Sequence, residues 1–337
     1  MRITVIGAGA IGGCVAAYLH KAGQNVVLIG KKDQVDAINS RGLLIKGVRG
    51  EEAIEVPCQV KMTTSCDLAI FATKTQDLED AFQVNNEYLE EGLMLTTQNG
   101  VQADNMLSVH FDNMRLLTSI VMFGSTYVKP GEITYNFDGN WIIGRPLTPL
   151  DPTAHSIGEV LSSAFKIAVV PDIMGMKYLK LFVNFNNCIP ALIGKSMQET
   201  FADLDLCRLS IMLLKEGIGI IQEAKIELAS IPDFPKEKIF GLANMPLEQA
   251  AGIINKTLTN LSKEPLYGSI LQSIMRGKPS EIDFINGEVV HLARHIKMSV
   301  PLNDKVVDMV HEVERTGKYF SVAEVNKIFG VIVSPVF

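Results

Sequence analysis

The hydrophobic positions near the start of the chain change period twice. Apolar residues dominate 3–6, recur at helical spacing over 11–19, and dominate again over 25–29. Short apolar runs predict buried strands, whereas the spaced pattern predicts a helix. The chain is therefore predicted to begin with a strand, a helix and a second strand parallel to the first.

The same patterns divide the rest of the chain into two parts. Buried strands are predicted at 66–72, 92–96 and 116–122, a helix at 34–40 with an edge strand at 43–45, and a helix at 156–164 with a strand at 167–170. Two antiparallel strands, 131–135 and 140–143, are predicted on either side of a turn at 137–140. From residue 174 the spacing is helical, with helices predicted at 174–192, 202–225, 247–260, 281–296 and 303–316.

These elements predict two domains in the chain of 337 residues. Single hydrophobic cores stop growing near about 250–300 residues, so a chain of this length is expected to divide. We expect an α/β Rossmann-type N-terminal domain over 1–171 and an all-α C-terminal helical domain over 172–337.

Gly7, Gly9 and Gly12 form a G-x-G-x-x-G motif between the first predicted strand and the helix. In dinucleotide-binding folds these glycines allow a tight turn, a close approach of the backbone to a pyrophosphate, and close packing of helix on strand. The pyrophosphate lies at the helix N-terminus, where N–H groups and the helix dipole favour an anion. We predict a Rossmann-type nucleotide site in which Ala10 and Ile11 also lie against the cofactor.

The residues after the second strand indicate which nicotinamide cofactor is bound. NAD sites usually place Asp or Glu there, about 20 residues on, to bond the ribose 2′-hydroxyl. Here the position is Gly30, followed by Lys31 and Lys32. No carboxylate repels a 2′-phosphate and two ammonium groups could pair with it, which predicts NADP(H) over NAD(H). The alternative is that both lysines are merely solvated, and Asp33 lies past the strand end.

Charge and hydropathy exclude several classes of partner. The net charge is −6 and no basic stripe appears, so neither nucleic acid nor an anionic membrane is expected to bind. The apolar stretch 3–19 follows Arg2 and would also suit a signal peptide or a marginal membrane span. A signal peptide has no need of three glycines at this spacing or of an immediate second strand, so the nucleotide site is preferred.

Cysteine and histidine positions predict no metal site. The five cysteines are scattered, without C-x-x-C or Cys/His spacing, which favours the reduced cytoplasm. His291 and His295 have a spacing that suits a metal, but no third ligand is near, so one face of an amphipathic helix is preferred. The apolar run 209–221 is either the core of the C-terminal domain or a subunit interface, as in a homodimer.

A polar stripe interrupts the apolar helix predicted at 174–192. Lys177, Lys180, Asn184 and Asn187 fall on one face of that helix. A nicotinamide enzyme must donate a proton or a positive charge to the substrate oxygen as negative charge develops there. These residues are candidates for that task, and the alternative is a partly exposed helix whose polar stripe meets water.

A second polar cluster follows the segment 269–272. Ser280 can cap the helix predicted at 281–296, and the helix dipole would then favour Glu281 and Asp283 in its first turn. From the residues alone this capping role is preferred, with a catalytic role as the alternative.

Taken together, six segments resemble the ketopantoate reductase family of 2-dehydropantoate 2-reductases. They are GAGAIG at 7–12, TK at 73–74, QNG at 98–100, K-x-x-x-N at 180–184, S-x-L-Q at 269–272 and EIDFING at 281–287. The segments follow the family's order and span nearly the whole chain. The resemblance implies NADP(H)-dependent reduction of a 2-keto acid to a 2-hydroxy acid. The leading expectation is 2-dehydropantoate to pantoate, on the route to pantothenate and coenzyme A.

The resemblance also implies roles for single residues. Lys180 matches the general acid at the ketone oxygen, and Glu281 matches the acid that holds the lysine and the substrate hydroxyl in place. Lys31 stands where the family commonly has Arg for the 2′-phosphate, and it supplies the charge without the bidentate fork. The other matched positions are Thr73, Lys74 and Asn99 for the cofactor and Lys74, Asn99, Asn184 and Ser269 for the substrate.

Two positions depart from the family pattern in the expected substrate pocket. Cys188 stands where the family usually has a second asparagine, and Asn187, better aligned with Lys180 on one helix, could replace it, so both are candidate substrate contacts. Gln198 lies where another asparagine often contacts the substrate. Small changes in such a pocket redirect specificity, so another 2-keto acid or an imine is an alternative substrate. A non-catalytic NADP(H)-binding sensor is a second alternative, but it would have no use for Lys180 and Glu281.

Overall fold

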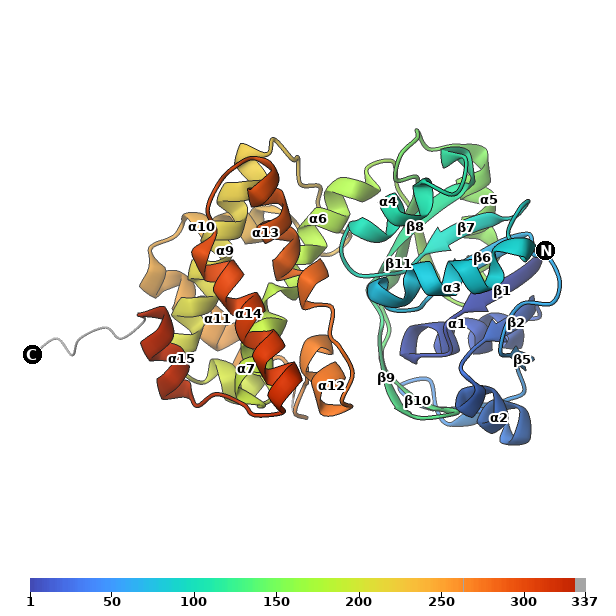
Figure 1. The fold of residues 1–337 in the computed structure, drawn as a ribbon, viewed down its shortest axis with the longest axis horizontal. Coiled ribbons are helices and arrows are strands. Elements are labelled where there is room, and N and C mark those ends of the chain that lie inside the picture. The colour runs from blue at the N-terminus through green and yellow to red at the C-terminus, as the bar shows by residue number, and fades with distance from the viewer. Residues whose placement is uncertain (263, 331–337) are drawn as a thin grey trace, which may run out of the picture. The chain divides into compact units, whose positions relative to one another are not determined.

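The computed structural model describes residues 1–262 and 264–330. They form two compact units, Met1–Met174 and a second unit that begins at Gly175. Every strand of the described residues lies in the first unit, and the second unit is built from helices (Figure 1). This confirms the predicted fold class, in which an α/β domain is followed by an all-α domain.

The first unit is built on an eight-stranded sheet with the order β12-β11-β8-β7-β6-β1-β2-β5. Its strands are β1 (Arg2–Ile6), β2 (Asn25–Ile29), β5 (Cys58–Gln59), β6 (Leu68–Phe71), β7 (Leu93–Thr96), β8 (Leu116–Val121), β11 (Asn140–Gly144) and β12 (Lys166–Val169). The strands from β8 to β5 are parallel, whereas β11 runs antiparallel to β8. The apolar runs predicted as buried strands are confirmed as β6, β7 and β8.

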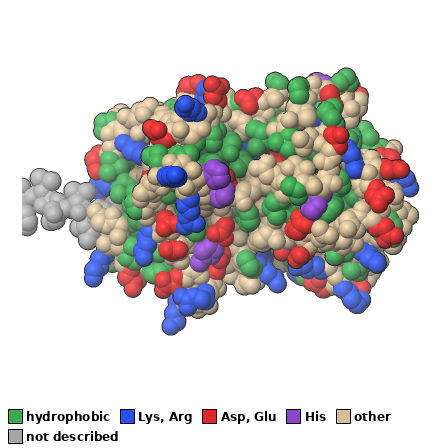
Figure 2. Space-filling view, turned by 45° about the horizontal axis from the view of Figure 1, so that its top comes forward, with side chains coloured by type: hydrophobic (Ala, Val, Ile, Leu, Met, Phe, Trp, Pro, Cys, Tyr) green, Lys and Arg blue, Asp and Glu red, His purple; other side chains and the backbone are tan. Residues whose placement is uncertain are grey.

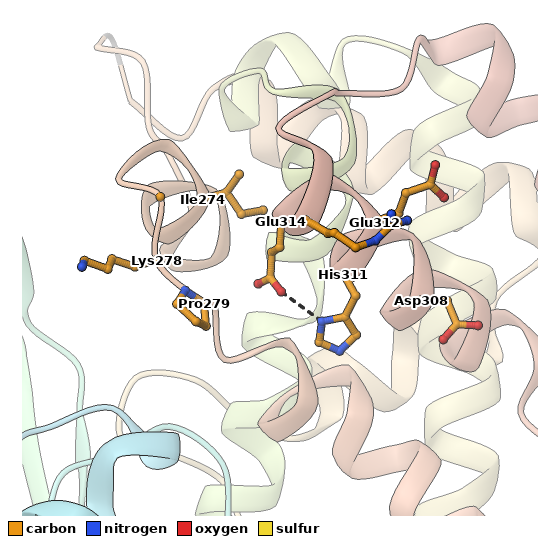
Figure 3. A pocket seen from close by; sticks show the side chains of 9 residues that line it. Ile274, Lys278, Pro279, Asp308, His311, Glu312 and Glu314 are labelled. Carbon is orange, nitrogen blue, oxygen red and sulfur yellow. Dashed lines mark hydrogen bonds and ion pairs between the residues drawn. The ribbon is translucent and has the colours of Figure 1, made fainter.

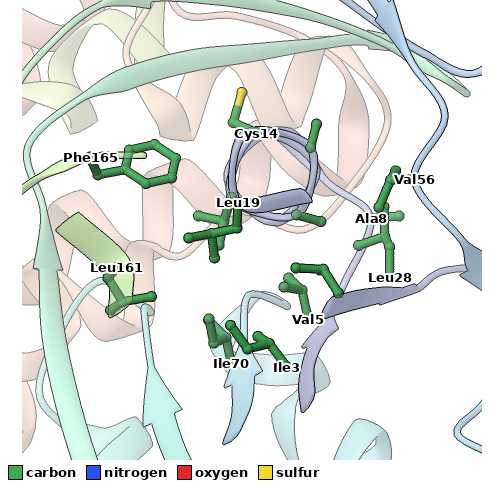
Figure 4. Close-up of a cluster of buried hydrophobic side chains, with 14 of the residues drawn as sticks. Ile3, Val5, Ala8, Cys14, Leu19, Leu28, Val56, Ile70, Leu161 and Phe165 are labelled. Carbon is green, nitrogen blue, oxygen red and sulfur yellow. The ribbon is translucent and has the colours of Figure 1, made fainter. Parts of the chain in front are cut away.

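Helices cover both faces of this sheet, because successive residues of a strand point to opposite faces. Val5 of β1 belongs to one apolar cluster together with Leu19 of α1 (Ala10–Lys21) and Leu161 of α5 (Pro152–Ser162) (Figure 4). The neighbouring Ile6 belongs to a second cluster with Phe82 of α3. The helices are α1 (Ala10–Lys21), α2 (Lys32–Arg41), α3 (Leu78–Asn85), α4 (Gln102–Ser108) and α5 (Pro152–Ser162), with 3₁₀ turns η1 (Thr75–Asp77), η2 (Asn86–Tyr88) and η3 (Asn113–Arg115).

A second sheet of four strands corrects two predictions. Its order is β4-β3-β10-β9, with β3 (Leu43–Gly47), β4 (Glu52–Ile54), β9 (Gly124–Lys129) and β10 (Glu132–Phe137). The segment 43–45 is not at an edge, because β3 lies between β4 and β10. The hairpin predicted between 131–135 and 140–143 is also wrong. β10 pairs with β9 and β3, whereas β11 pairs with β8 and β12 in the large sheet.

The reason for the wrong hairpin lies in two neighbouring turns. Gly131, with φ of 74°, makes the tight connection from β9 to β10. A positive φ is a conformation that glycine adopts without steric penalty. The turn at 137–140 instead carries the chain from the small sheet to the large one. Both turns contain glycine, so local turn signals do not tell which of them closes a hairpin.

The second unit is a set of helices around α9. Its elements are α6 (Ile173–Asn184), η4 (Phe185–Asn187), α7 (Cys188–Ile193), α8 (Met197–Phe201), α9 (Leu204–Glu223), α10 (Glu237–Asn244), α11 (Leu247–Thr259), α12 (Ser269–Met275), η5 (Ile282–Phe284), α13 (Asn286–His295), α14 (Pro301–Thr316) and α15 (Val322–Phe329). Helix α9 packs against α8, α10, α11, α13, α14 and α15. Most of its run 209–221 is buried within this chain, so the run forms the core of the unit.

Two predicted helices are interrupted. The segment 174–192 contains the 3₁₀ turn η4 between α6 and α7. Pro190 has no N–H to donate to the carbonyl of Asn186, so one continuous helix would lose that hydrogen bond. The segment 281–296 begins with η5, and the regular helix α13 starts only at Asn286.

Charged side chains of both signs share the surface, and the cysteines are buried. Lys and Arg side chains are interspersed with Asp and Glu side chains on the face drawn in Figure 2. All five cysteines are buried and none forms a disulfide. Within residues 1–262 and 264–330, no helix has both the length and the apolarity that a bilayer span requires.

Candidate active site

The glycine motif forms a tight turn between β1 and α1. Gly7 has φ of 117°, and a Cβ there would lie 2.7 Å from the backbone N of Thr73. A Cβ at Gly12 would collide with the carbonyl of Gly7, so these two glycines are needed for close packing. By contrast, no atom lies within 4 Å of a Cβ built at Gly9. The turn is therefore closed on its inner side and open at Gly9, where a ligand can approach the backbone.

The N-terminus of α1 suits an anion. Its N-cap residue is Gly9, which offers no side chain to the first N–H groups, and the first turn contains no acidic residue. Ala10 and Ile11 are the first two helical residues. Helix N-termini of this kind bind phosphate groups through their N–H groups and the helix dipole. The residues present thus fit the pyrophosphate of a dinucleotide.

The end of β2 has room for neither an aspartate nor a glutamate without rearrangement. A Cβ at Gly30 would lie 2.7 Å from the Cβ of Ala8 and 3.1 Å from Oε1 of Gln34. The following Lys31 is exposed and is the N-cap of α2. Its neighbour Lys32 already forms an ion pair of 2.9 Å with an aspartate one turn further along α2. Lys31 is therefore the better placed of the two lysines for a 2′-phosphate.

The side chain of Gln98 links the ends of β6 and β7 by hydrogen bonds. Its Nε2 donates hydrogen bonds of 3.0 Å to the carbonyls of Phe71 and Thr73, and Thr97 donates from Oγ1 to the same Phe71 carbonyl at 2.9 Å. Open parallel sheets bind their ligands at the carboxyl ends of the strands. The sequence gives no sign of this role, although Gln98 belongs to the QNG segment that carries the resemblance.

Thr73 and Lys74 follow the end of β6, and Asn99 follows the end of β7. The Oγ1 of Thr73 is buried and makes no hydrogen bond to any described residue. Buried hydroxyls are normally paired, so an orphan beside the glycine turn fits a site that a ligand completes. Lys74 and Asn99 are half-buried, and the neighbouring Thr75 lies with its Oγ1 3.5 Å from the carbonyl of Asn99.

Lys180 of α6 is half-buried, and burial lowers its pKa from 10.5 to about 8. A lysine with this pKa gives up its proton far more readily than an exposed one near neutral pH. Lys177, one turn earlier on the same helix, is 3% exposed.

Asn187 lies beside the start of α12. A Cβ built at Gly268 would come within 2.5 Å of its Oδ1, and Gly268 is the N-cap of the helix that begins with Ser269. The structure thus brings the predicted substrate residues Asn187 and Ser269 together. The predicted alignment of Asn187 with Lys180 assumed one continuous helix, and η4 interrupts that helix between them. Asn184, also predicted at the substrate, is the last residue of α6 and is half-buried.

The two departures from the family pattern have structural explanations. Cys188 is fully buried, its Sγ donates to the carbonyl of Phe185 at 3.0 Å, and burial raises the pKa of the thiol to about 12. Such a side chain packs the core and presents no surface to a substrate. Gln198 donates to the carbonyls of Ser262 and Glu264 and accepts from the N–H of Leu266. Gln198 therefore holds backbone groups of its own unit in place.

Glu281 is not the exposed capping residue that its position suggests. It is 6% exposed, precedes η5, and lies outside the first turn of α13. Ser280 accepts a hydrogen bond of 3.2 Å from the N–H of Ile282, so it caps η5 alone. The capping explanation for Glu281 and Asp283 on a helix over 281–296 is therefore wrong, because the regular helix α13 begins only at Asn286.

The described residues contain no group of three or more His, Cys, Asp or Glu side chains that could hold a metal ion. The rings of His291 and His295 lie 6.0 Å apart on α13.

Comparisons with known proteins agree over most of the chain. The family model described as ketopantoate reductase PanE/ApbA matches residues 3–147, and that of the C-terminal part of ketopantoate reductase PanE/ApbA matches residues 172–314. The 2-dehydropantoate 2-reductase of Pyrococcus horikoshii is 29% identical over 325 residues, which cover 94% of this chain and 99% of the relative. That of Pyrococcus abyssi is 27% identical, over 90% of this chain and 94% of the relative.

Solved structures share the fold. A PanE/ApbA family ketopantoate reductase from Ralstonia eutropha superposes with a TM-score of 0.79 at 20% identity, covering 94% of this chain and 99% of that one. A D-mandelate dehydrogenase with NADH and anilino(oxo)acetate superposes with a TM-score of 0.80 at 20% identity and the same coverage. The two family models account for both units of the structure, and the chain belongs to the ketopantoate reductase family.

Proposed function

We propose that this chain catalyses the NADPH-dependent reduction of 2-dehydropantoate to pantoate, as a step towards pantothenate. Family membership and the names of the curated relatives support the reaction class. The observation that carries the chemical step is the half-buried Lys180, whose pKa burial lowers to about 8. We assign dinucleotide binding to residues 1–171 and substrate binding to residues 172–337.

The cofactor residues are proposed from the fit of the site. Gly7, Gly9 and Gly12, with Ala10 and Ile11, would hold the pyrophosphate at the start of α1. When bound, the nicotinamide supplies the hydride that reaches the keto carbon.

Lys31 would pair with the 2′-phosphate of NADPH, and the crowded position Gly30 leaves no place for the acid that favours NAD. The NADH-bound D-mandelate dehydrogenase shows that a similar fold accepts the other cofactor. Lys31→Ala is expected to raise KM for NADPH and leave KM for NADH unchanged. Lys32→Ala is the matched control, because Lys32 is paired with Asp36. Equal effects of Lys31→Ala on both cofactors would reject the 2′-phosphate assignment.

Lys180 would protonate the ketone oxygen as negative charge develops on it. Glu281 would accept hydrogen bonds from the Lys180 ammonium and from the new hydroxyl of the substrate, and so orient both. The substrate would bring the two residues into one hydrogen-bonded network. Thr73, Lys74 and Asn99 would line the nicotinamide side of the site, and Lys74, Asn99, Asn184, Asn187 and Ser269 would bind the substrate. Cys188 is left out of this assignment, since its thiol is fully buried.

A second candidate function is reduction of a different 2-keto acid. The buried Cys188 stands where the family usually has a substrate-binding asparagine, so one polar contact is missing unless Asn187 supplies it. Loss of such a contact weakens the preference for a hydroxylated substrate.

Oxidation of NADPH, followed by nicotinamide absorbance, tests both candidates with 2-dehydropantoate and a panel of 2-keto acids without its hydroxyl. Selective turnover of 2-dehydropantoate supports the first candidate, and preference for an acid without the hydroxyl supports the second. Lys180→Ala should lower kcat by about 10²–10⁴, the usual contribution of a general acid. Lys180→Arg is the matched variant, because it keeps the charge but does not release a proton. Full activity of either variant would reject the role of Lys180, and tight NADPH binding without any turnover would indicate a sensor.

A further inference from the structure

The residues on both sides of Glu281 form hydrogen bonds with helix α14. On one side, the N–H of Ser280 donates to Oε1 of Glu314 at 2.7 Å. On the other side, Oδ1 of Asp283 lies 2.9 Å from Nε2 of His311, and Nδ1 of the same ring lies 2.9 Å from Oε2 of Glu314. Figure 3 shows His311 and Glu314 side by side on α14 with this bond between them. We call Asp283, His311 and Glu314 the α14 clasp.

The segment around Glu281 has little regular structure of its own to hold it. Glu281 precedes a 3₁₀ turn of three residues, and the helix α13 begins only after Ile285, whose φ of −117° and ψ of −88° are not helical. Yet Glu281 is only 6% exposed, and the flanking hydrogen bonds to α14 are among the contacts that surround it. A displacement of about 1 Å in a group that orients a substrate can reduce the rate by about 10²-fold.

We propose that His311 and Glu314 are positioning residues that fix the carboxylate of Glu281 for the reaction by holding the backbone before it and the side chain after it. This inference rests on the proposed role of Glu281 in reduction. Neither residue is a catalytic residue in this account, since neither touches the reacting atoms. They act through Ser280 and Asp283.

The charges in the clasp suit this task. Burial opposes a proton on His311, but the hydrogen bonds to Asp283 and Glu314 outweigh it and raise the pKa of the imidazole. A protonated imidazole is a donor at both ring nitrogens, which the two facing carboxylates require. A cavity of about 710 Å³ reaches His311, so solvent can exchange its proton. The other charged groups that line the cavity are Lys278, Asp308, Glu312 and Arg315.

A double-mutant cycle in the full chain tests the proposal. His311→Ala is combined with Glu281→Gln, and kcat/KM for 2-dehydropantoate and the melting temperature are measured for each protein. The single variant His311→Ala is expected to lose between about 10-fold and 10²-fold in kcat/KM. In the Glu281→Gln background the same change should lose much less, because the carboxylate that the clasp positions is already gone. The Kd for NADPH should stay unchanged in all variants, since the glycine turn belongs to the first unit.

Two further variants guard against a simple folding defect. Glu314→Gln keeps the shape and the acceptor for Ser280 but removes the charge that faces His311, and it is expected to show a smaller loss with the same dependence on Glu281. Glu312→Gln is the matched control, because Glu312 lines the same cavity on α14 without a side-chain bond to the segment. It should retain wild-type kcat/KM.

The outcomes separate this proposal from the proposed function. If Glu281→Gln is impaired while His311→Ala and Glu314→Gln retain full activity, the clasp has no positioning role and only the inference fails. If the losses from His311→Ala and Glu281→Gln multiply independently, the clasp acts on general stability and the inference also fails. If Glu281→Gln itself retains full activity, or the wild type reduces no 2-keto acid, the proposed function and the inference fall together.

Discussion

Replacement of Lys180 by methionine is expected to stabilise the fold while it removes the proposed activity. Burial lowers the pKa of Lys180 from 10.5 to about 8. One pKa unit corresponds to about 1.36 kcal/mol, so keeping this ammonium charged in the folded protein costs at most about 3 kcal/mol. Lys180 is only half-buried and solvent screens part of this cost, so we expect the uncharged methionine to gain about 1–2 kcal/mol at neutral pH.

The expected gain depends on pH with a definite sign. Below pH 8, Lys180 is charged in both the folded and the unfolded chain, and the full penalty applies. Between pH 8 and 10.5 the unfolded chain binds more protons than the folded one, so the stability of the wild type rises relative to that of the variant. Above pH 10.5 both states are neutral at this position, and only the difference in packing remains.

Urea unfolding of wild type and Lys180→Met at pH 7 and pH 10, followed by circular dichroism, measures this difference. The free energy of unfolding of the variant should exceed that of the wild type at pH 7, and the excess should shrink at pH 10. Lys177→Met is the matched control. Lys177 is 3% exposed and interacts with other described residues, so its replacement is expected to destabilise the protein. A variant at Lys180 that is less stable than the wild type at pH 7, or whose gain is the same at both pH values, would refute the reasoning.

Three further predictions concern the second unit. The kcat of the wild type should fall as pH rises through about 8, the pKa of Lys180, because the neutral amine has no proton to donate; a kcat that is flat from pH 7 to pH 9 would contradict this. Gly268→Ala would place a Cβ 2.5 Å from Oδ1 of Asn187 and is expected to raise KM for the keto acid severalfold, whereas Gly252→Ala, with no atom within 4 Å, should not. Gln198→Ala loses its hydrogen bonds to Ser262, Glu264 and Leu266 and should lower the free energy of unfolding by about 1–3 kcal/mol. A change in substrate preference at unchanged stability would instead show that Gln198 contacts the substrate.

The first unit shows which parts of a fold follow from local sequence. The strand predicted at 25–29 is β2 (Asn25–Ile29), and the helix predicted at 11–19 lies within α1, because apolar spacing and a glycine turn are both local signals. Strand pairing is not local. The residues of β9 are only half-buried or exposed, so the segment 124–129 has no apolar pattern that predicts a strand. Without that strand, the sequence does not indicate which partner β10 pairs with.

In the second unit, sequence motifs identified candidate residues but not their arrangement. Helical spacing predicts Asn187 on the same face as Lys180, but the 3₁₀ turn η4 interrupts the helix between them. Pro190 was the available signal, since proline beyond the first turn of a helix removes a backbone hydrogen bond. The apolar residues around Cys188 predict an inert, packed thiol, and Cys188 is fully buried.

Glu281 shows most clearly why a site cannot be completed from local patterns. A serine followed by two acids predicts a helix cap, and Ser280 does cap, but only the short turn η5. The residues on either side of Glu281 are hydrogen-bonded to α14, Ser280 to Glu314 and Asp283 to His311. A residue that reacts is marked by its own motif, because the chemistry demands one residue type at one place. A residue that holds it in place can come from any element that packs nearby, so its role becomes visible only when the fold brings the two segments together.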